Sequence, residues 1–159
     1  MSAVHTHEAD DLRELYRELI LDHARSPRHF GKLDAATHTA RGINPLCGDR
    51  LQLFLQLDQA ERIAAASFEG SGCAISVASA SLLTDSVIGM SATEALELFT
   101  AFTAQLCDQQ DVAVVIPRLG KLQALSGVRE FPARVKCATL AWHALESAIS
   151  QRSATATTE

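Results

Sequence analysis

The sequence predicts an α+β fold, in which a small antiparallel three-stranded sheet packs against several helices. The first reason is order: segments with the period of a strand are grouped within residues 37–68, and segments with the period of a helix follow them. The second is that only short turns separate the strand segments, and short turns join antiparallel neighbours. We therefore expect an antiparallel meander followed by helices that cover it.

The first half of the chain contains one helix and the three strands. An amphipathic helix is expected over residues 10–24, where apolar residues recur at the spacing of one helix face until Pro27 stops it. The segment 37–43 is a weak strand candidate. Residues 51–57 alternate leucine with other side chains, which indicates a half-buried strand, and residues 63–68 supply the third.

Helices make up the second half. A buried helix rich in small residues is expected over 73–89, and Ser-Ala-Thr-Glu at 91–94 forms a capping box that opens another. The stretch 111–127 is ambiguous, because a proline and a glycine interrupt it, although its leucine spacing suggests a short helix. A last helix is expected over 134–149, with Trp142 facing inward.

Length and composition indicate one globular unit. The 159 residues are enough to bury a core, and 47% of them are apolar. We expect a single domain over residues 1–151 and a disordered, Ser/Thr/Ala-rich tail over 152–159. A net charge of −5 favours neither nucleic acid nor an anionic membrane as a partner.

The four cysteines help to indicate the cellular compartment in which the protein works. The start of the chain has no apolar segment of the kind found in secretory signals, and no apolar run is long enough to span a bilayer. Cysteines in a chain without an export signal favour thiol or metal chemistry over a disulfide framework. The expected location is therefore the cytoplasm.

Three cysteines lie where a turn meets a regular element. Around Cys47, a proline stiffens the chain and Gly48 permits a sharp turn, so Cys47 and Asp49 can point the same way. Cys73 follows Gly-Ser-Gly and is expected to start a helix, and Cys137 is expected in the first turn of the last helix. Both helix starts would favour thiolates and lower their pKa.

Three soft thiolates and one hard carboxylate suit a zinc or iron–sulfur site with one exchangeable ligand. The competing interpretation is that these are buried apolar thiols, as single free cysteines often are. That interpretation fits Cys107, which ends a helix with an apolar face. A zinc hydrolase or deaminase is disfavoured because the chain lacks both His-Glu-x-x-His and Pro-Cys-x-x-Cys. A purely structural zinc module is disfavoured because a chain of this size needs no metal to fold.

The three cysteines lie in the motifs Asn-Pro-Leu-Cys-Gly-Asp at 44–49, Gly-Ser-Gly-Cys-Ala-Ile-Ser at 70–76 and Lys-Cys-Ala at 136–138. These motifs resemble the three ligand motifs of the NifU/IscU family of iron–sulfur cluster assembly proteins. The resemblance runs from about residue 15 to 149. It includes Asp22, His23, Pro27, Arg28 and Phe-Pro-Ala-Arg at 131–134. It implies an α+β sandwich with Cys47, Asp49, Cys73 and Cys137 at one exposed end.

Two departures resemble the SufU branch of this family. Lys136 stands where IscU-type scaffolds have a histidine, and the segment between the second and third cysteines is longer. The resemblance implies zinc held by Cys47, Asp49, Cys73 and Cys137. It also implies that Cys47 accepts persulfide sulfur from a cysteine desulfurase of SufS type, whose histidine replaces Cys47 on the metal during docking.

Two points stay open at this level. Arg134 and Lys136 are candidates for stabilising an anionic persulfide, or they are ordinary surface charges at a helix start. The alternative function is a scaffold, on which Cys47, Cys73 and Cys137 hold a transient [2Fe–2S] or [4Fe–4S] cluster before it passes to apo-proteins. Zinc and iron clusters accept the same ligands, so the sequence leaves both functions open.

Overall fold

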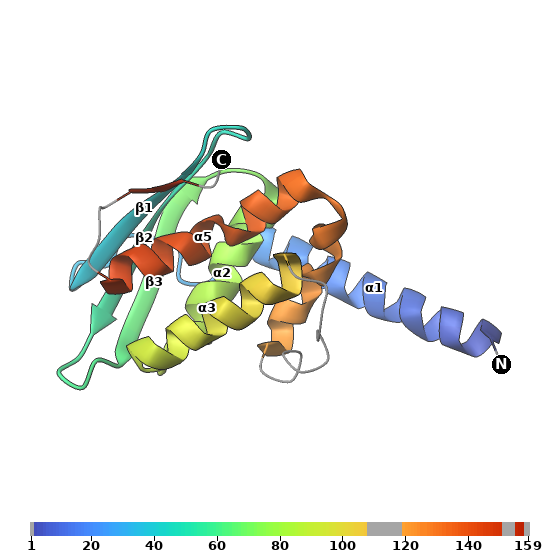
Figure 1. The fold of residues 1–159 in the computed structure, drawn as a ribbon, viewed down its shortest axis with the longest axis horizontal. Helices are drawn as coiled ribbons and strands as arrows, with labels where there is room; N and C mark the ends of the chain where they lie inside the picture. Colours follow the sequence, from blue (N-terminus) through green and yellow to red (C-terminus); the bar gives the residue numbers. More distant parts are fainter. Residues whose placement is uncertain (1, 108–118, 151–154, 158–159) are drawn as a thin grey trace.

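Three successive strands lie side by side, joined by short turns (Figure 1). In the computed structural model, which describes residues 2–107, 119–150 and 155–157, β1 (His38–Asn44) pairs antiparallel with β2 (Asp49–Leu57). β2 in turn pairs antiparallel with β3 (Ile63–Ser71). The predicted α+β class and three-stranded meander are confirmed.

A fourth strand, β4 (Thr155–Thr157), pairs parallel with β1 and gives the order β3-β2-β1-β4. The expected disordered tail includes these three residues, which the structure describes as a strand, and the rest of the tail lies outside the described residues. The edge of the meander explains the difference, since an edge strand offers unpaired N–H and C=O groups to any extended segment nearby. The amino-acid composition of the tail does not indicate that an edge strand lies near enough to pair with it.

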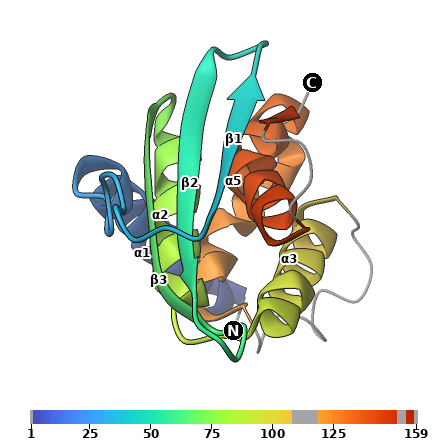
Figure 2. The same cartoon turned by 90° about the vertical axis from the view of Figure 1, so that its left-hand side faces the viewer.

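The helices lie on one face of this sheet (Figure 2). They are α1 (Ser2–Arg25), α2 (Ala74–Val87), α3 (Ala92–Cys107), the 3₁₀ helix η1 (Gly120–Glu130) and α5 (Pro132–Ser150). α5 packs on β1 and β2, and α2 packs on β3. α1 contacts α2 and η1, and α3 contacts η1 and α5. No helix in the described part of the chain combines the length and apolarity needed to cross a bilayer.

Two helices differ from their predicted bounds. α1 begins at Ser2 and not near residue 10, and its first turns project away from the rest of the molecule (Figure 1). Apolar periodicity reports burial, and residues 2–9 do not show the spacing of an apolar helix face, so the pattern did not predict this part of the helix. In the ambiguous stretch 111–127, residues 119–127 are described, and the suggested short helix is present there as the start of η1, a 3₁₀ helix.

The core lies between the sheet and the helices. Trp142 is fully buried, stacks on Phe102 with ring centroids 4.5 Å apart, and donates an indole hydrogen bond to Ser79 Oγ at 3.1 Å. The predicted inward orientation of Trp142 is confirmed. The capping box is also confirmed, because Ser91 N–H donates to Glu94 Oε1 at 3.0 Å and Glu94 N–H donates to Ser91 Oγ at 3.1 Å.

Candidate metal centre

The turn between β1 and β2 is held from inside by Asn44, the last residue of β1. Its carbonyl oxygen accepts the N–H groups of Cys47 at 3.3 Å and Gly48 at 2.9 Å, while its side-chain Oδ1 accepts the N–H of Leu46 at 3.3 Å. Gly48 has φ +72°, a conformation that side chains rarely adopt. The turn leaves Cys47 exposed and Asp49 buried.

Asp49 joins the start of β2 to the start of α2. Its Oδ1 accepts the backbone N–H of Cys73 at 2.9 Å, and Cys73 is the N-cap residue of α2. The approach requires glycine at position 72, since a Cβ atom there would lie 2.4 Å from Asp49 Oδ1. Asp49 is fully buried, and its second oxygen, Oδ2, has no hydrogen-bond partner among the described residues.

Cys137 reaches the same place from α5. Its Sγ lies 3.5 Å from Cys47 Sγ and 3.5 Å from the carbonyl oxygen of Ala133, two acceptors for its one proton. Asn44 Nδ2 donates to the same Sγ at 3.7 Å. Burial raises the pKa of Cys137 far above its usual range, and the neighbouring Asp49, Cys47 and Cys73 side chains raise it further. The thiol form is therefore strongly favoured in the metal-free protein.

The predicted helix-start setting of Cys137 is wrong. α5 begins at Pro132, so Cys137 lies in its second turn, and only 2% of the residue is exposed. The partial charge of a helix terminus acts within the first turn, so it does not lower the pKa of this thiol. Of the two cysteines, only Cys73 lies at a helix N-terminus.

The structure thus brings residues from three separate motifs together. One ligand atom from each of Cys47, Asp49 and Cys137 lies within 4.8 Å of the other two. Cys73 adjoins this group: it shares a cavity of about 380 Å³ with Cys47 and Cys137, and its side chain interacts with Cys137. The fourth cysteine, Cys107, ends α3 as predicted, and its side chain lies outside the described residues.

These residues fit a metal ion on chemical grounds. A buried carboxylate oxygen without a partner costs free energy, and a cation would remove that cost. Thiolate sulfur suits zinc and iron, and the structure brings Asp49 within reach of Cys47 and Cys137, three of the four expected ligands. The unpaired Oδ2 of Asp49 is the observation that favours a metal over a cluster of buried thiols.

The two basic candidates are placed differently. Arg134 is exposed and lines the cavity that contains the three thiols, with its guanidinium carbon 5.6 Å from the centre of the Phe131 ring. Lys136 is half-buried and is not among the described residues that line this cavity. The structure therefore favours Arg134 over Lys136 as the positively charged residue beside the three thiols.

Sequence reasoning missed Asn44 as part of the site. The Asn-Pro pair marked a turn, and nothing local indicated that the side chain would be fully buried against Cys137. Asp22, His23 and Arg28, which belong to the N-terminal part of the family resemblance, lie where the end of α1 meets α2. Asp22 pairs with Arg28 at 2.6 Å, and buried His23 contacts Ser81 of α2 at 2.7 Å, so these residues fasten α1 to α2.

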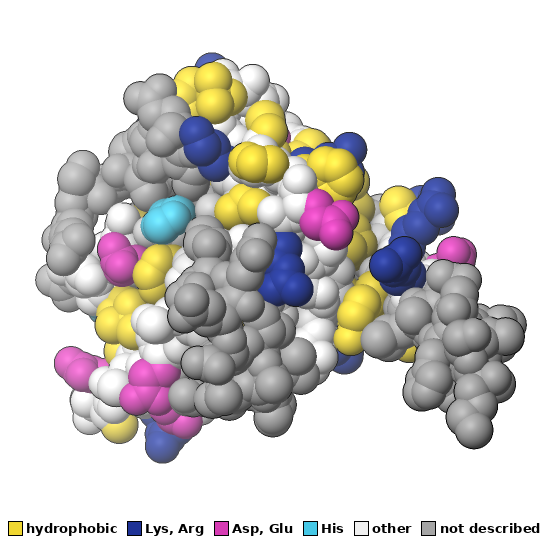
Figure 3. All heavy atoms as spheres, turned by 45° about the vertical axis from the view of Figure 1, so that its right-hand side comes forward, with side chains coloured by type: hydrophobic (Ala, Val, Ile, Leu, Met, Phe, Trp, Pro, Cys, Tyr) yellow, Lys and Arg dark blue, Asp and Glu magenta, His cyan; other side chains and the backbone are white. Residues whose placement is uncertain are grey.

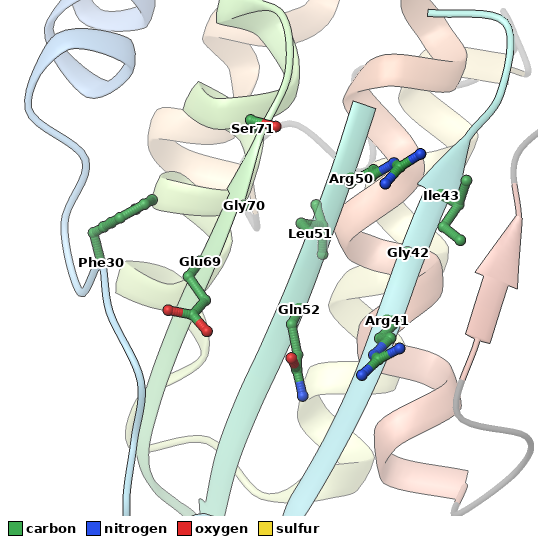
Figure 4. A pocket seen from close by; sticks show the side chains of 10 residues that line it. All are labelled: Phe30, Arg41, Gly42, Ile43, Arg50, Leu51, Gln52, Glu69, Gly70 and Ser71. Carbon is green, nitrogen blue, oxygen red and sulfur yellow. The ribbon is translucent and has the colours of Figure 1, made fainter. Parts of the chain in front are cut away.

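A separate hollow of about 540 Å³ lies on the opposite face of the sheet (Figure 4). Arg41, Gln52 and Glu69 form a row across β1, β2 and β3, with Arg50 and Phe30 nearby. No thiol lines this hollow among the described residues. Among the described thiols, Cys47, Cys73 and Cys137 all line the other cavity, at the end of the sheet where β1 turns into β2.

Comparison with known proteins identifies the family. Residues 15–158 match the model of the NifU-like N terminal domain, which is nearly the whole chain. The chain belongs to this family. The NifU/IscU resemblance inferred from the cysteine motifs is therefore confirmed.

Two relatives of this NifU-like domain carry different names. A protein of Streptococcus pyogenes serotype M1, named iron–sulfur cluster assembly scaffold protein IscU, is 43% identical over 145 residues, which are 91% of this chain and 88% of that protein. A protein of Bacillus subtilis strain 168, named zinc-dependent sulfurtransferase SufU, is 40% identical over 142 residues, which are 89% and 93% of the two chains.

The fold is also found among solved structures. The crystal structure of a SufU of Fervidobacterium islandicum AW-1, assigned as an iron–sulfur cluster assembly scaffold for the SUF system, superposes on this NifU-like domain with a TM-score of 0.72. The two sequences are 33% identical, and the match covers 83% of this chain and 94% of that one. The sheet and helices described above are therefore those of the family.

Proposed function

We propose that this protein is an iron–sulfur cluster assembly protein of SufU type, which accepts persulfide sulfur from a cysteine desulfurase on Cys47. The observation that carries the proposal is the convergence of Cys47, Asp49 and Cys137 within 4.8 Å, with a carboxylate oxygen left unpaired. The similarity to a zinc-dependent sulfurtransferase supports zinc as the metal. Cys47, Asp49, Cys73 and Cys137 would hold it.

When bound, zinc would keep the thiols ionised and protect them from oxidation, because it has no redox chemistry of its own. The chain itself separates the roles of the ligands. Cys137 and Asp49 are buried and positioned by neighbouring elements, whereas Cys47 and Cys73 are both exposed. Cys73 caps the N-terminus of α2, whereas Cys47 lies on the turn between β1 and β2. Cys47 is therefore the exposed thiol outside a helix, and we assign the acceptor role to it.

Sulfur transfer on Cys47 is a thiol exchange that needs no added oxidant or reductant. The Cys47 thiolate attacks the outer sulfur of the desulfurase persulfide and forms a new S–S bond with it. The bond between that sulfur and the desulfurase cysteine breaks, and the desulfurase cysteine leaves as a thiolate. The outer sulfur, with its proton, is then a persulfide on Cys47. The Arg134 guanidinium lines the same cavity and would stabilise the ionised persulfide.

The second candidate is a scaffold on which an iron–sulfur cluster is built and then released. The similarity to a protein named as an IscU scaffold favours it, and the same three cysteines would hold the cluster. Lys136 weighs against it, because an ammonium is not a metal ligand at neutral pH, whereas a histidine in its place would be one.

The first experiment tests the metal and the acceptor together. The purified protein should contain about one zinc per chain, and Cys73→Ala or Cys137→Ala should abolish tight binding. With a SufS-type desulfurase and cysteine, mass spectrometry should find added sulfur on Cys47, and the protein should stimulate desulfurase turnover. Cys107→Ser is the matched control and should retain zinc and stimulation.

Two results would contradict the proposal. One is full zinc occupancy in both Cys73→Ala and Cys137→Ala. The other is stimulation that survives Cys47→Ser, with the added sulfur found on Cys107.

Anaerobic reconstitution with iron and sulfide separates the two candidates. The transferase proposal expects the wild type to retain zinc and to hold a cluster poorly, as measured by visible absorbance and transfer to an apo-ferredoxin. Lys136→His restores an imidazole before Cys137 and should lengthen the lifetime of any cluster formed. A stable, transferable cluster that displaces zinc stoichiometrically from the wild type would establish the scaffold instead.

A further inference from the structure

An apolar groove of about 640 Å³ lies between α1 and η1. Its walls include Tyr16 and Ile20 of α1 and Ala124 and Val128 of η1. The two walls meet through the Tyr16 hydroxyl, which lies 3.5 Å from Gln123 Oε1. Concave surfaces lined mainly by apolar side chains are typical of binding sites.

An exposed aromatic residue, Phe131, forms one side of the groove. Phe131 lies in the link between η1 and α5, lines the groove and is 54% exposed. Large apolar side chains gathered at an open groove mark contact surfaces, whereas isolated ones need no explanation. Figure 3 shows hydrophobic and basic side chains side by side where α1 leaves the body of the molecule.

The charge at this groove is opposite in sign to that of the whole chain. Arg13, Arg17 and Arg134 line it, and no carboxylate does among the described residues. Arg13 and Arg17 are four residues apart on α1, so they share one helix face. The chain as a whole carries a net charge of −5. The groove is therefore a local basic rim around an apolar surface on an acidic protein.

The groove is continuous with the thiol cavity. Ala74, Ile75 and Arg134 line both, and Ala74 directly follows Cys73. A protein that binds in the groove therefore has the thiols at the edge of its contact surface. Attack on a persulfide requires atomic contact between two sulfurs, so the protein that delivers sulfur must be held immediately beside Cys47.

We propose that this groove binds an acidic segment with an apolar face on the cysteine desulfurase that supplies sulfur to Cys47. The proposal rests on the proposed function, because that function requires such a donor. The apolar face of the segment packs against the groove walls formed by Tyr16, Ile20 and Val128. Its carboxylates pair with Arg13 and Arg17, which steer association and fix the orientation of the complex.

Binding is measured apart from chemistry, in a Cys47→Ser background that cannot accept sulfur on this residue. The probe is a SufS-type desulfurase, and its Kd is determined by titration calorimetry. The Arg13→Glu/Arg17→Glu variant should weaken binding by about tenfold or more, since each 1.4 kcal/mol changes Kd tenfold. Ile20→Asp should weaken desulfurase binding to a similar extent, because it places a charge on an apolar wall of the groove. Arg25→Glu reverses an exposed charge of the same helix outside the groove and should stay within about twofold of wild type.

Several measurements separate docking from folding and from the site. All variants should keep the wild-type zinc content and the wild-type rate of Cys47 labelling by a small thiol reagent, measured with Cys47 present. The affinity of the wild type should fall with added salt, and that of the double arginine variant should fall much less.

Unchanged Kd in both Arg13→Glu/Arg17→Glu and Ile20→Asp would overturn the docking surface, even if sulfur transfer occurs. Variants that bind the desulfurase normally but fail to pass sulfur or a cluster to an apo-protein would assign the groove to the acceptor, which also overturns the proposal. If the wild type binds the desulfurase through the groove but Cys47 gains no sulfur, the proposed function fails while the docking surface stands.

Discussion

Gly72 shows how a residue that binds no metal can determine the position of a candidate ligand. Its missing side chain leaves room for Asp49, which approaches the end of β3 and accepts the N–H of Cys73 at 2.9 Å. A Cβ atom would lie 2.4 Å from the carboxylate oxygen, and the fully buried Asp49 has little room to retreat. The geometry of the ligand set therefore depends on a residue that binds no metal.

We predict that Gly72→Ala weakens zinc binding by about 10–100-fold, the usual range when a residue that supports a ligand is lost. The reason is displacement of Asp49 together with loss of its bond to Cys73. Competition with a chromogenic chelator measures the affinity. Gly127→Ala is the matched control, because a Cβ atom there meets nothing within 4 Å, and it should bind zinc like the wild type. Equal affinities in the two variants would contradict this account.

At the scale of elements, α1 is fastened to α2 by a buried polar joint. Ser81 Oγ accepts the N–H of Arg28 at 2.8 Å and lies 2.7 Å from His23 Nδ1, a hydrogen-bonding distance whose direction depends on the tautomer of the ring. Burial lowers the pKa of His23, and the charges of Arg28 and Lys121 lower it further. Asp22 and Asp85 act in the opposite direction. The folded protein thus favours a neutral imidazole at His23.

This joint predicts that the protein loses stability as the pH falls below about 6.5, the ordinary pKa of histidine. The unfolded chain takes up a proton on His23 near that pH, whereas the folded chain does so only at lower pH, so stability is complete above this range and declines below it. Urea unfolding at a series of pH values from 7.5 to 5 measures the effect.

His23→Gln should be less stable at pH 7.5 but should lose less on acidification. Burial also lowers the pKa of His143, so His23→Gln/His143→Gln should show the flattest profile. A His23→Gln variant with the wild-type pH dependence would contradict the role of this joint.

At the scale of the whole molecule, the core and the metal site are separate. The largest buried side chains, such as Trp142, Phe102 and Leu53, pack between the sheet and the helices. The thiols lie at one end of the molecule, where β1 turns into β2 and the N-terminal parts of α2 and α5 meet. A metal bound there would join the β1–β2 turn, α2 and α5, which already pack together through the core.

We predict that removing zinc with a chelator leaves the protein folded at 25 °C. Trp142 is the single tryptophan of the chain, so its fluorescence reports directly on the core, and its emission maximum should stay unshifted. Added zinc should raise the stability, by about 4 kcal/mol at a free concentration 1,000 times its Kd. Circular dichroism and thermal unfolding with and without chelator check this. An unfolded apo-protein would make the metal a structural one.

The parts of this protein that could be read from its sequence are those made by neighbouring residues. The alternating leucines of β2 predicted its buried face, and Ser91 and Glu94 predicted a reciprocal cap that the structure contains. The Cys47-Gly48-Asp49 turn likewise brings two ligand atoms together within three residues. Each feature depends on backbone geometry over a few positions, which local sequence specifies.

Tertiary packing decided the rest, because burial and charge depend on segments distant in the chain. Cys137 was expected as a helix-start thiolate, but its position under Cys47 and Asn44 buries it and raises its pKa. β4 formed because an edge strand was free, and the arginine-lined groove exists only where α1 meets η1. A local sequence pattern does not show which distant segment will pack against a residue. That packing determines the exposure of the side chain and, for a titratable group, its pKa.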